Sequence, residues 1–221
     1  MTEPEILEAL ERAEVALDTG RDLSGTGFWK AVAAVKRDPE LVERHADRIA
    51  AIDRRAFEGW AALTTTVPFG TTVVAGAMAA GVASLGYSAK ARPPWNWLLF
   101  GFGTGALLAT THGIGHLVVG RTFGMRFTHW FLAPGRPQPG VKVDYASYLK
   151  TPPKQRAWMH ASGALITKVV PFALLPLARR MPRWVFRLMV GVGIVQIVTD
   201  IAWSTRASDW KKFRREIRYA P

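Results

Sequence analysis

Two histidines, His112 and His116, lie four residues apart near the end of a long apolar run, and Gly113, Ile114 and Gly115 separate them. Residues four apart lie on the same face of an α-helix, so both imidazoles would point to the same side. Ionisable side chains inside a membrane helix are costly and count as a functional hypothesis by default. The pair therefore predicts two nitrogen ligands for one metal ion.

A third ligand is expected from Asp200, which lies in another apolar run. Asp200 precedes Arg206 by six residues and His112 precedes Arg121 by nine, or about 9 Å and about 13 Å along a helix. At these similar depths, two imidazoles and one carboxylate can meet. Three such ligands with an open fourth position suit a catalytic Zn²⁺, and the absence of Cys excludes thiolate ligands. We therefore predict zinc bound by His112, His116 and Asp200.

Further segments follow the histidines in a definite order. They are Gly124-Met-Arg-Phe127, a Pro/Gly-centred hairpin sequence, Gly163-Ala-Leu-Ile-Thr167 and then Asp200. Together with His112-Gly-Ile-Gly-His116 they resemble the site-2 protease family of intramembrane zinc metalloproteases. That family has a His-Glu-x-x-His motif, a Gly-hydrophobic-x-hydrophobic segment, a membrane-associated hairpin, a Gly-Pro-x-x-Asn motif and an aspartate ligand in this order. The resemblance covers about residues 95–209 and implies a zinc site and transmembrane helices of other proteins as partners.

The chain also departs from the family's pattern. The glutamate that activates the zinc-bound water in that family is replaced here by Gly113. Ala164 and Thr167 stand where the family has Pro and Asn, and Ile201 stands where it has the Gly after its aspartate. Loss of a general base typically costs about 10² to 10⁴ in rate. The resemblance therefore implies a degenerate member with impaired or absent peptidase activity.

The residues leave three other interpretations open. An active hydrolase could use His160 or Asp144 as a relocated base, and His160 could also be a replacement ligand or support a ligand by a hydrogen bond. Haem needs facing histidines on two helices, and only His160 could partner the pair. In a metal-free membrane scaffold or regulator, the glycines would pack helices closely and the histidines would hydrogen-bond to Asp200 or Thr199.

The elements that must hold these side chains are membrane helices, as the composition indicates. Of the 221 residues, 49% are hydrophobic, yet the formal net charge is +12. Four apolar runs, 60–88, 95–120, 157–178 and 184–205, approach the roughly 20 residues that a helix needs to span a bilayer. The predicted fold class is an all-α polytopic membrane protein with about four transmembrane helices.

The basic charge lies beside these apolar runs. After residue 58 the chain has 20 Lys and Arg but only four acidic residues, and the basic ones gather at the ends of the runs. This pattern is typical of anchors to anionic lipid, so we expect the lipid bilayer as a partner and no nucleic acid. Four spans would put 22 of the 29 Lys and Arg on the side of both termini. The positive-inside rule then predicts a multi-pass cell-membrane protein with both termini cytoplasmic.

The chain divides into three predicted parts. Residues 1–57 form a small cytoplasmic helical cap, with helices beginning after Thr2 and after Asp38, and its last helix can run into the first span. Residues 58–206 form the transmembrane domain, whose protease-like core (95–209) includes a short β-hairpin at the cytoplasmic rim within 125–145. Residues 207–221 are a basic cytoplasmic tail.

Overall fold

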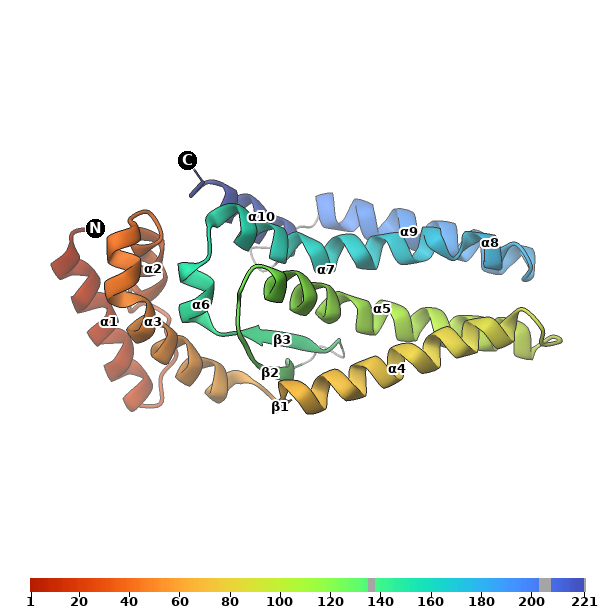
Figure 1. Ribbon diagram of the computed structural model, residues 1–221, viewed down its shortest axis with the longest axis horizontal. Coiled ribbons are helices and arrows are strands. Elements are labelled where there is room, and N and C mark those ends of the chain that lie inside the picture. The colour runs from red at the N-terminus through yellow and green to blue at the C-terminus, as the bar shows by residue number, and fades with distance from the viewer. Residues whose placement is uncertain (135–137, 203–207, 221) are drawn as a thin grey trace.

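A computed structural model describes residues 1–134, 138–202 and 208–220 of the chain. The molecule is elongated, with long helices side by side and both termini at one end (Figure 1). The loops at 89–94 and 179–182 lie at the opposite end. The chain thus runs back and forth along the long axis, as expected for a helical membrane protein.

The helical cap consists of α1 (Glu3–Asp18), α2 (Phe28–Val35) and α3 (Pro39–Trp60). The predicted helix starts are confirmed: the Thr2 N–H donates to the Glu5 carboxylate at 2.7 Å, and the Asp38 carboxylate accepts from the Glu40 N–H at 2.9 Å. Such caps satisfy the free N–H groups of the first turn. The three helices enclose an apolar core that includes Ile6, Leu10, Phe28, Val35, Ala46 and Ile49.

A small antiparallel sheet lies between the cap and the long helices. Its strands are β1 (Leu63–Thr66), β2 (Phe127–Leu132) and β3 (Gly140–Val143), in the order β1-β2-β3. The predicted hairpin is confirmed as the β2–β3 pair, with Trp130 opposite Val141. The turn residues 135–137 lie outside the described residues.

The strand β1 differs from the sequence-based expectation that the apolar run from residue 60 is one helix. The segment Leu63-Thr-Thr-Thr66 is rich in β-branched residues and pairs with β2, with Thr65 opposite Trp130. The next helix begins only at Val67, with Pro68 in its first turn, where proline is tolerated. The last helix of the cap therefore ends at Trp60 and does not run into the first span.

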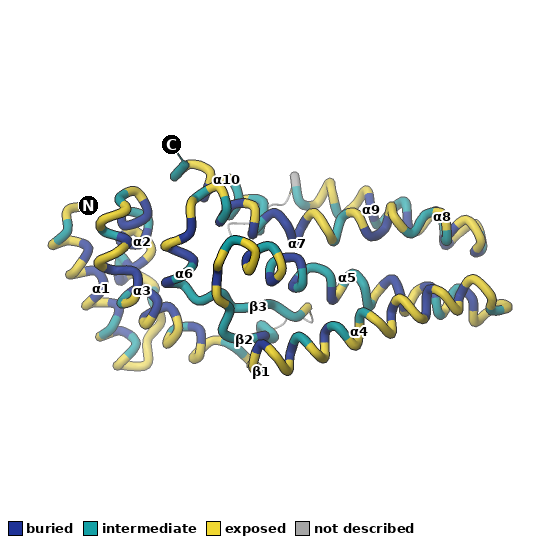
Figure 2. The backbone as a smooth tube through the Cα atoms, in the orientation of Figure 1, coloured by how far each residue is buried: buried dark blue, intermediate teal, exposed yellow. Residues whose placement is uncertain are grey.

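Three stretches of the described residues are long and apolar enough to cross a membrane. They are α4 (Val67–Ser88), α5 (Trp95–Thr122) and the stretch Pro153–Ala178, which comprises α7 (Pro153–Ala173) and α8 (Leu175–Ala178). These helices indicate a multi-pass membrane protein. Large apolar side chains on them are exposed, among them Phe69, Phe102 and Val169, and exposed positions recur along their length (Figure 2).

The fourth predicted span coincides with α9 (Arg183–Ala202), which lies beside α7. It is not among the three candidate spans of the described residues. Residues 203–205 of the predicted span lie outside the part of the chain that the structure describes. A fourth crossing therefore stays a prediction.

Two short helices connect the cap to the long helices. Helix α6 (Tyr145–Lys150) follows β3 and packs on α3, and α10 (Asp209–Ile217) packs on α7. The predicted basic tail begins at 207, outside the described residues, and most of its described part is α10. Because α10 lies against α7 at the cap end of the molecule, the residue at its start is placed near the histidine helix.

Candidate metal centre

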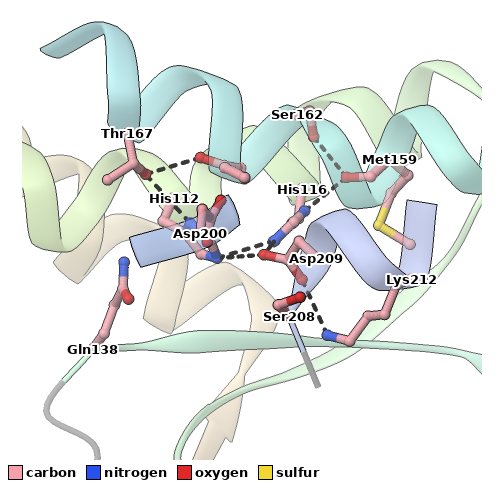
Figure 3. Close-up of polar contacts among 12 residues, drawn as sticks. His112, His116, Gln138, Met159, Ser162, Thr167, Asp200, Ser208, Asp209 and Lys212 are labelled. Carbon is pink, nitrogen blue, oxygen red and sulfur yellow. Dashed lines mark hydrogen bonds and ion pairs between the residues drawn. The ribbon is translucent and has the colours of Figure 1, made fainter. Parts of the chain in front are cut away.

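The two histidines meet on α5 as their spacing predicts. Their Nε2 atoms are 3.2 Å apart and their ring centroids are 4.7 Å apart, with the ring planes nearly perpendicular. Both side chains are partly buried. The close-up in Figure 3 shows the two rings pointing to a common point from one helix face.

The carboxylate beside the histidines belongs to Asp209, the first residue of α10. Its Oδ2 lies 3.0 Å from His112 Nε2 and 3.3 Å from His116 Nε2. These three residues form a group that could hold a metal ion, with one ligand atom from each and all three atoms within 4.8 Å of one another (Figure 3). The group thus combines two histidines from α5 with a residue that we had assigned to the tail.

The three distances match a tetrahedral zinc site. Zinc bonds to His and carboxylate ligands are about 2.0–2.1 Å long, which places neighbouring ligand atoms of a tetrahedron about 3.3 Å apart. The observed separations of 3.2, 3.0 and 3.3 Å agree with one face of such a tetrahedron. The ligand atoms therefore need little movement to receive the ion.

Hydrogen bonds to the far side of each ring favour the tautomer that a metal requires. His116 Nδ1 lies 2.7 Å from the Met159 carbonyl, so Nδ1 is the protonated nitrogen. His112 Nδ1 lies 3.3 Å from Thr167 Oγ1, whose own hydroxyl donates to the Gly163 carbonyl at 2.8 Å. The Thr167 oxygen is thus left to accept from His112. Both Nε2 lone pairs then point at the common centre, in the arrangement by which outer partners orient metal ligands.

The Asp209 carboxyl is ionised at neutral pH. Burial raises its pKa, but its contacts with His112 and His116, together with the Lys212 cation, outweigh this effect and hold the pKa well below its ordinary value. Lys212, one turn further along α10, contacts the other oxygen, Oδ1, at 3.0 Å. One carboxylate oxygen is thus held by a cation while the other faces the imidazoles, as a ligand carboxylate needs.

Glycines allow α7 to approach α5 at the histidines. A Cβ at Gly163 would lie 2.5 Å from His116 Nε2 and 2.8 Å from the His112 carbonyl oxygen, closer than real Cβ atoms come. A Cβ at Gly115 would lie 3.1 Å from Gly163 Cα. Gly163 and Thr167 thus serve the site from the segment that the sequence singled out, the first by leaving room and the second by orienting His112.

Gly113 faces away from the histidine cluster and against the sheet. A Cβ there would lie 2.5 Å from the ring of Trp130, which is buried and inserts between α5 and α4. On the α4 side, a Cβ at Gly70 would also meet that ring at 2.5 Å, and Trp130 Nε1 donates to Thr71 Oγ1 at 3.0 Å. The position at which the resembled family carries its glutamate is therefore filled by an indole.

His116 and Asp209 line two cavities, and His112 lines the larger one. An open one of about 900 Å³ also contacts Gln138, Lys168 and Asp200. A second, of about 370 Å³, lies toward the cap and is lined by His116 and Asp209 together with aromatic residues, among them Trp29, Phe57, Phe127 and Phe131. These cavities leave room beside the group for a fourth metal ligand.

The other predicted site residues have different partners. Asp200, the expected third ligand, forms an ion pair with Lys168 in the wall of the larger cavity. His160 Nε2 lies 2.9 Å from the Tyr148 hydroxyl, and its ring centroid is 6.5 Å from that of His116. Asp144 caps α6 by accepting from the Ser147 N–H. None of the three belongs to the candidate ligand group among the described residues.

The sequence contains a signal for Asp209 that its position in a basic tail obscures. After Asp200 the chain has only two acidic residues, Asp209 and Glu216, among six Lys and Arg. They are seven residues apart and therefore lie on one helix face. Both are withdrawn from solvent, with 13% and 0% of their side chains exposed. Isolated acids on one face of a basic helix thus indicate buried partners.

Comparisons with protein-family models, with curated proteins and with solved structures find no match to this chain. The interpretation of the site therefore depends on its own geometry.

Proposed function

We propose that the chain is an integral membrane metalloprotein in which His112, His116 and Asp209 bind Zn²⁺. The observation that carries this proposal is the convergence of three ligand atoms within 4.8 Å, with each imidazole fixed by its Nδ1 contact. Two histidines and one carboxylate with an open fourth position match catalytic zinc sites. Zinc bound there would act as a Lewis acid toward a ligand that enters from the larger cavity.

The proposed class is that of a site-2-protease-like protein that has lost ordinary peptide hydrolysis. The histidine pair on one apolar helix, the following hairpin and the Gly163–Thr167 contacts support the likeness. Loss of hydrolysis is supported by Gly113, since Trp130 fills the space that a side chain would need. His160 and Asp144, the proposed substitutes for the base, are engaged by Tyr148 and by the start of α6. Recognition of transmembrane helices of other proteins is the activity that we propose remains.

We place the protein in the cell membrane with both termini in the cytoplasm. Support comes from the excess of Lys and Arg at the end of the molecule that holds the termini. The metal centre then lies near the cytoplasmic face, beside the cap.

Zinc content tests this proposal directly. Protein purified in detergent should contain close to one zinc per chain by elemental analysis. His112→Ala and Asp209→Ala should each lower the zinc content at least tenfold, because three protein ligands are few enough that each is needed. Asp200→Asn is the matched control, since its carboxylate lines the same cavity but pairs with Lys168, and it should retain zinc. Absence of zinc from the wild-type protein after reconstitution would overturn the proposal.

A metal-free scaffold is the second candidate function. The direct His112–Asp209 contact of 3.0 Å favours this alternative, because the two side chains can hold α5 and α10 together without an ion. On that alternative, His112→Ala and Asp209→Ala lower the thermal stability while neither the wild type nor the variants contain zinc.

A further inference from the structure

A second buried cluster of charges lies at the other end of α10. Glu216 is fully buried, and its carboxylate accepts from two cations: Lys36 Nζ lies 2.6 Å from Oε1 and Arg156 Nε lies 2.8 Å from Oε2. The three side chains come from α10, from the residue that follows α2 in the helical cap, and from α7. Glu216 thus joins three parts of the chain at one point.

The surroundings of this cluster shield it from solvent. Arg156 is 2% exposed and also donates to the carbonyls of Leu149 and Thr151, at 2.8 and 2.9 Å. Lys36 Nζ lies 4.9 Å from the centre of the Tyr148 ring, a cation–π contact. Burial lowers the pKa of Lys36 to about 8, with Glu216 opposing the shift, so the amine is still largely charged at neutral pH.

The buried ion pairs of Glu216 hold α10 in its position. Removing one partner of a buried ion pair leaves a charge unpaired in a poor solvent for it, which is strongly unfavourable. Separation of the cap from α10 would leave Lys36 without its ion pair and would remove the closest cation from the Glu216 carboxylate, which would keep Arg156 at 2.8 Å and Arg215 at 3.9 Å. Docking of the cap on α10 is therefore favoured by these charges as well as by apolar contact.

Asp209 lies two helical turns before Glu216 on the same face of α10. One end of this nine-residue helix meets the histidines and the other meets the buried cations. Helix α10 is preceded by residues 203–207, which lie outside the described part of the chain. Within the described residues, the contacts of α10 with α7 and with the cap therefore hold Asp209 in place.

We propose that Lys36 and Glu216 are positioning residues for Asp209, so that docking of the helical cap sets the affinity of the metal centre. The inference rests on the proposed metal site. It gives the cap a role, because a partner that draws Lys36 away from Glu216 weakens metal binding, and by thermodynamic reciprocity metal binding strengthens docking of the cap.

The test compares Co²⁺ and Zn²⁺ binding to the full-length wild type and to Lys36→Met. This variant leaves Glu216 paired with Arg156, so it is expected to fold, and circular dichroism checks its helical content. Its metal affinity should fall by up to about tenfold, the lower end of the range for partners in direct contact with metal ligands, because Lys36 acts on Asp209 only through Glu216 and α10. The visible absorption of bound Co²⁺, which reports ligand geometry, should change as well. Lys36→Arg should restore both properties, because it keeps the cation.

Arg48→Met is the matched control. Arg48 of α3 forms a partly buried ion pair within the cap, with Glu14 of α1, and this pair lines neither cavity at the site and does not involve α10. The variant should lower thermal stability without changing metal affinity or the Co²⁺ spectrum. Wild-type affinity and spectrum in Lys36→Met would overturn the positioning role while leaving the metal site standing. Absence of metal binding in the wild type would instead overturn the proposed function and the inference with it.

Discussion

The ring of Trp130 occupies the space that a side chain at position 113 would need, so the two residues fit only as a pair. The indole is 3% exposed and occupies the place of a side chain at Gly113, and it is held there by its hydrogen bond to Thr71. A carboxylate cannot be added at Gly113 without moving the ring or the helix. A carboxylate at position 113 would therefore need a smaller residue at position 130 as well.

Gly113→Glu alone should not produce hydrolysis, and it should lower thermal stability, because overpacking of a filled site costs about 1–3 kcal/mol. The double variant Gly113→Glu/Trp130→Ala has room for the carboxylate and should gain cleavage of a transmembrane-helix substrate in proteoliposomes. The gain should approach the 10² to 10⁴ that a general base supplies. Trp130→Ala alone is the control and should stay inactive. Cleavage by the single Gly113→Glu variant would show that the indole does not block the position.

The candidate metal ligands illustrate what spacing can and cannot predict. His112 and His116 are fixed relative to each other by one helix, so their convergence follows from the four-residue interval. Asp200 was chosen as the third ligand by its depth in a separate helix, and depth says nothing about the direction of a side chain. In the structure Asp200 turns to Lys168, and Asp209 takes the place beside the imidazoles. That choice depends on how α10 folds back on α7. The isolated acids of the basic tail indicate that Asp209 has a buried partner, but they do not identify the partner.

Helices α5 and α7 pack closely along a seam at the candidate metal centre. Gly163 makes it possible, because its Cα lies where any side chain would strike His116 Nε2 and the His112 carbonyl. Small residues at helix interfaces let backbones approach in this way in membranes, where packing and hydrogen bonds replace the hydrophobic effect. The same seam brings Met159 and Thr167 within reach of the two rings.

Gly163→Ala should therefore lower both thermal stability and zinc content. The added methyl must displace a ligand atom or backbone, at a cost of about 1–3 kcal/mol. Gly105→Ala in α5 is the matched control, since a Cβ there meets nothing within 4 Å. It should be neutral or slightly stabilising, because Ala is the better helix former. Thermal unfolding in detergent and elemental analysis measure the two effects, and equal behaviour of the two variants would contradict the role of the seam.

The elements show a similar division between local and tertiary control. Short motifs predict the capped starts of α1 and α3 and the β2–β3 hairpin. The structure contains these three features. The sequence does not predict strand β1, because Leu63–Thr66 continues an apolar run. Four residues are also too few to show the alternation of side chains that identifies a strand. Its partner β2 lies more than 60 residues later in the chain. A strand defined by such a distant partner cannot be recognised from its own sequence.

The distribution of charge along the molecule bears on its orientation. The termini, the helical cap and α10 lie at one end, and the loops at 89–94 and 179–182 lie at the other (Figure 1). The first end holds most of the Lys and Arg, so the positive-inside rule directs it to the cytoplasm. With three crossings the two termini would lie on opposite sides of the bilayer, whereas a fourth crossing by α9 returns the C-terminus to the side of the cap. Because Asp209 and Glu216 of α10 contact α5, α7 and the cap, the metal centre requires that return.

Single cysteines can decide this point, since the chain has none of its own and gives no background labelling. Ser24→Cys in the cap, Ala89→Cys in the first loop and Arg218→Cys after α10 all replace exposed residues. A membrane-impermeant maleimide on intact cells should label only the cysteine at position 89. Those at 24 and 218 should react only after permeabilisation, because four crossings put both on the cytoplasmic side. Labelling of the cysteine at 218, but not at 24, from outside would mean that α9 does not cross, and α10 could then not deliver Asp209 to His112 and His116.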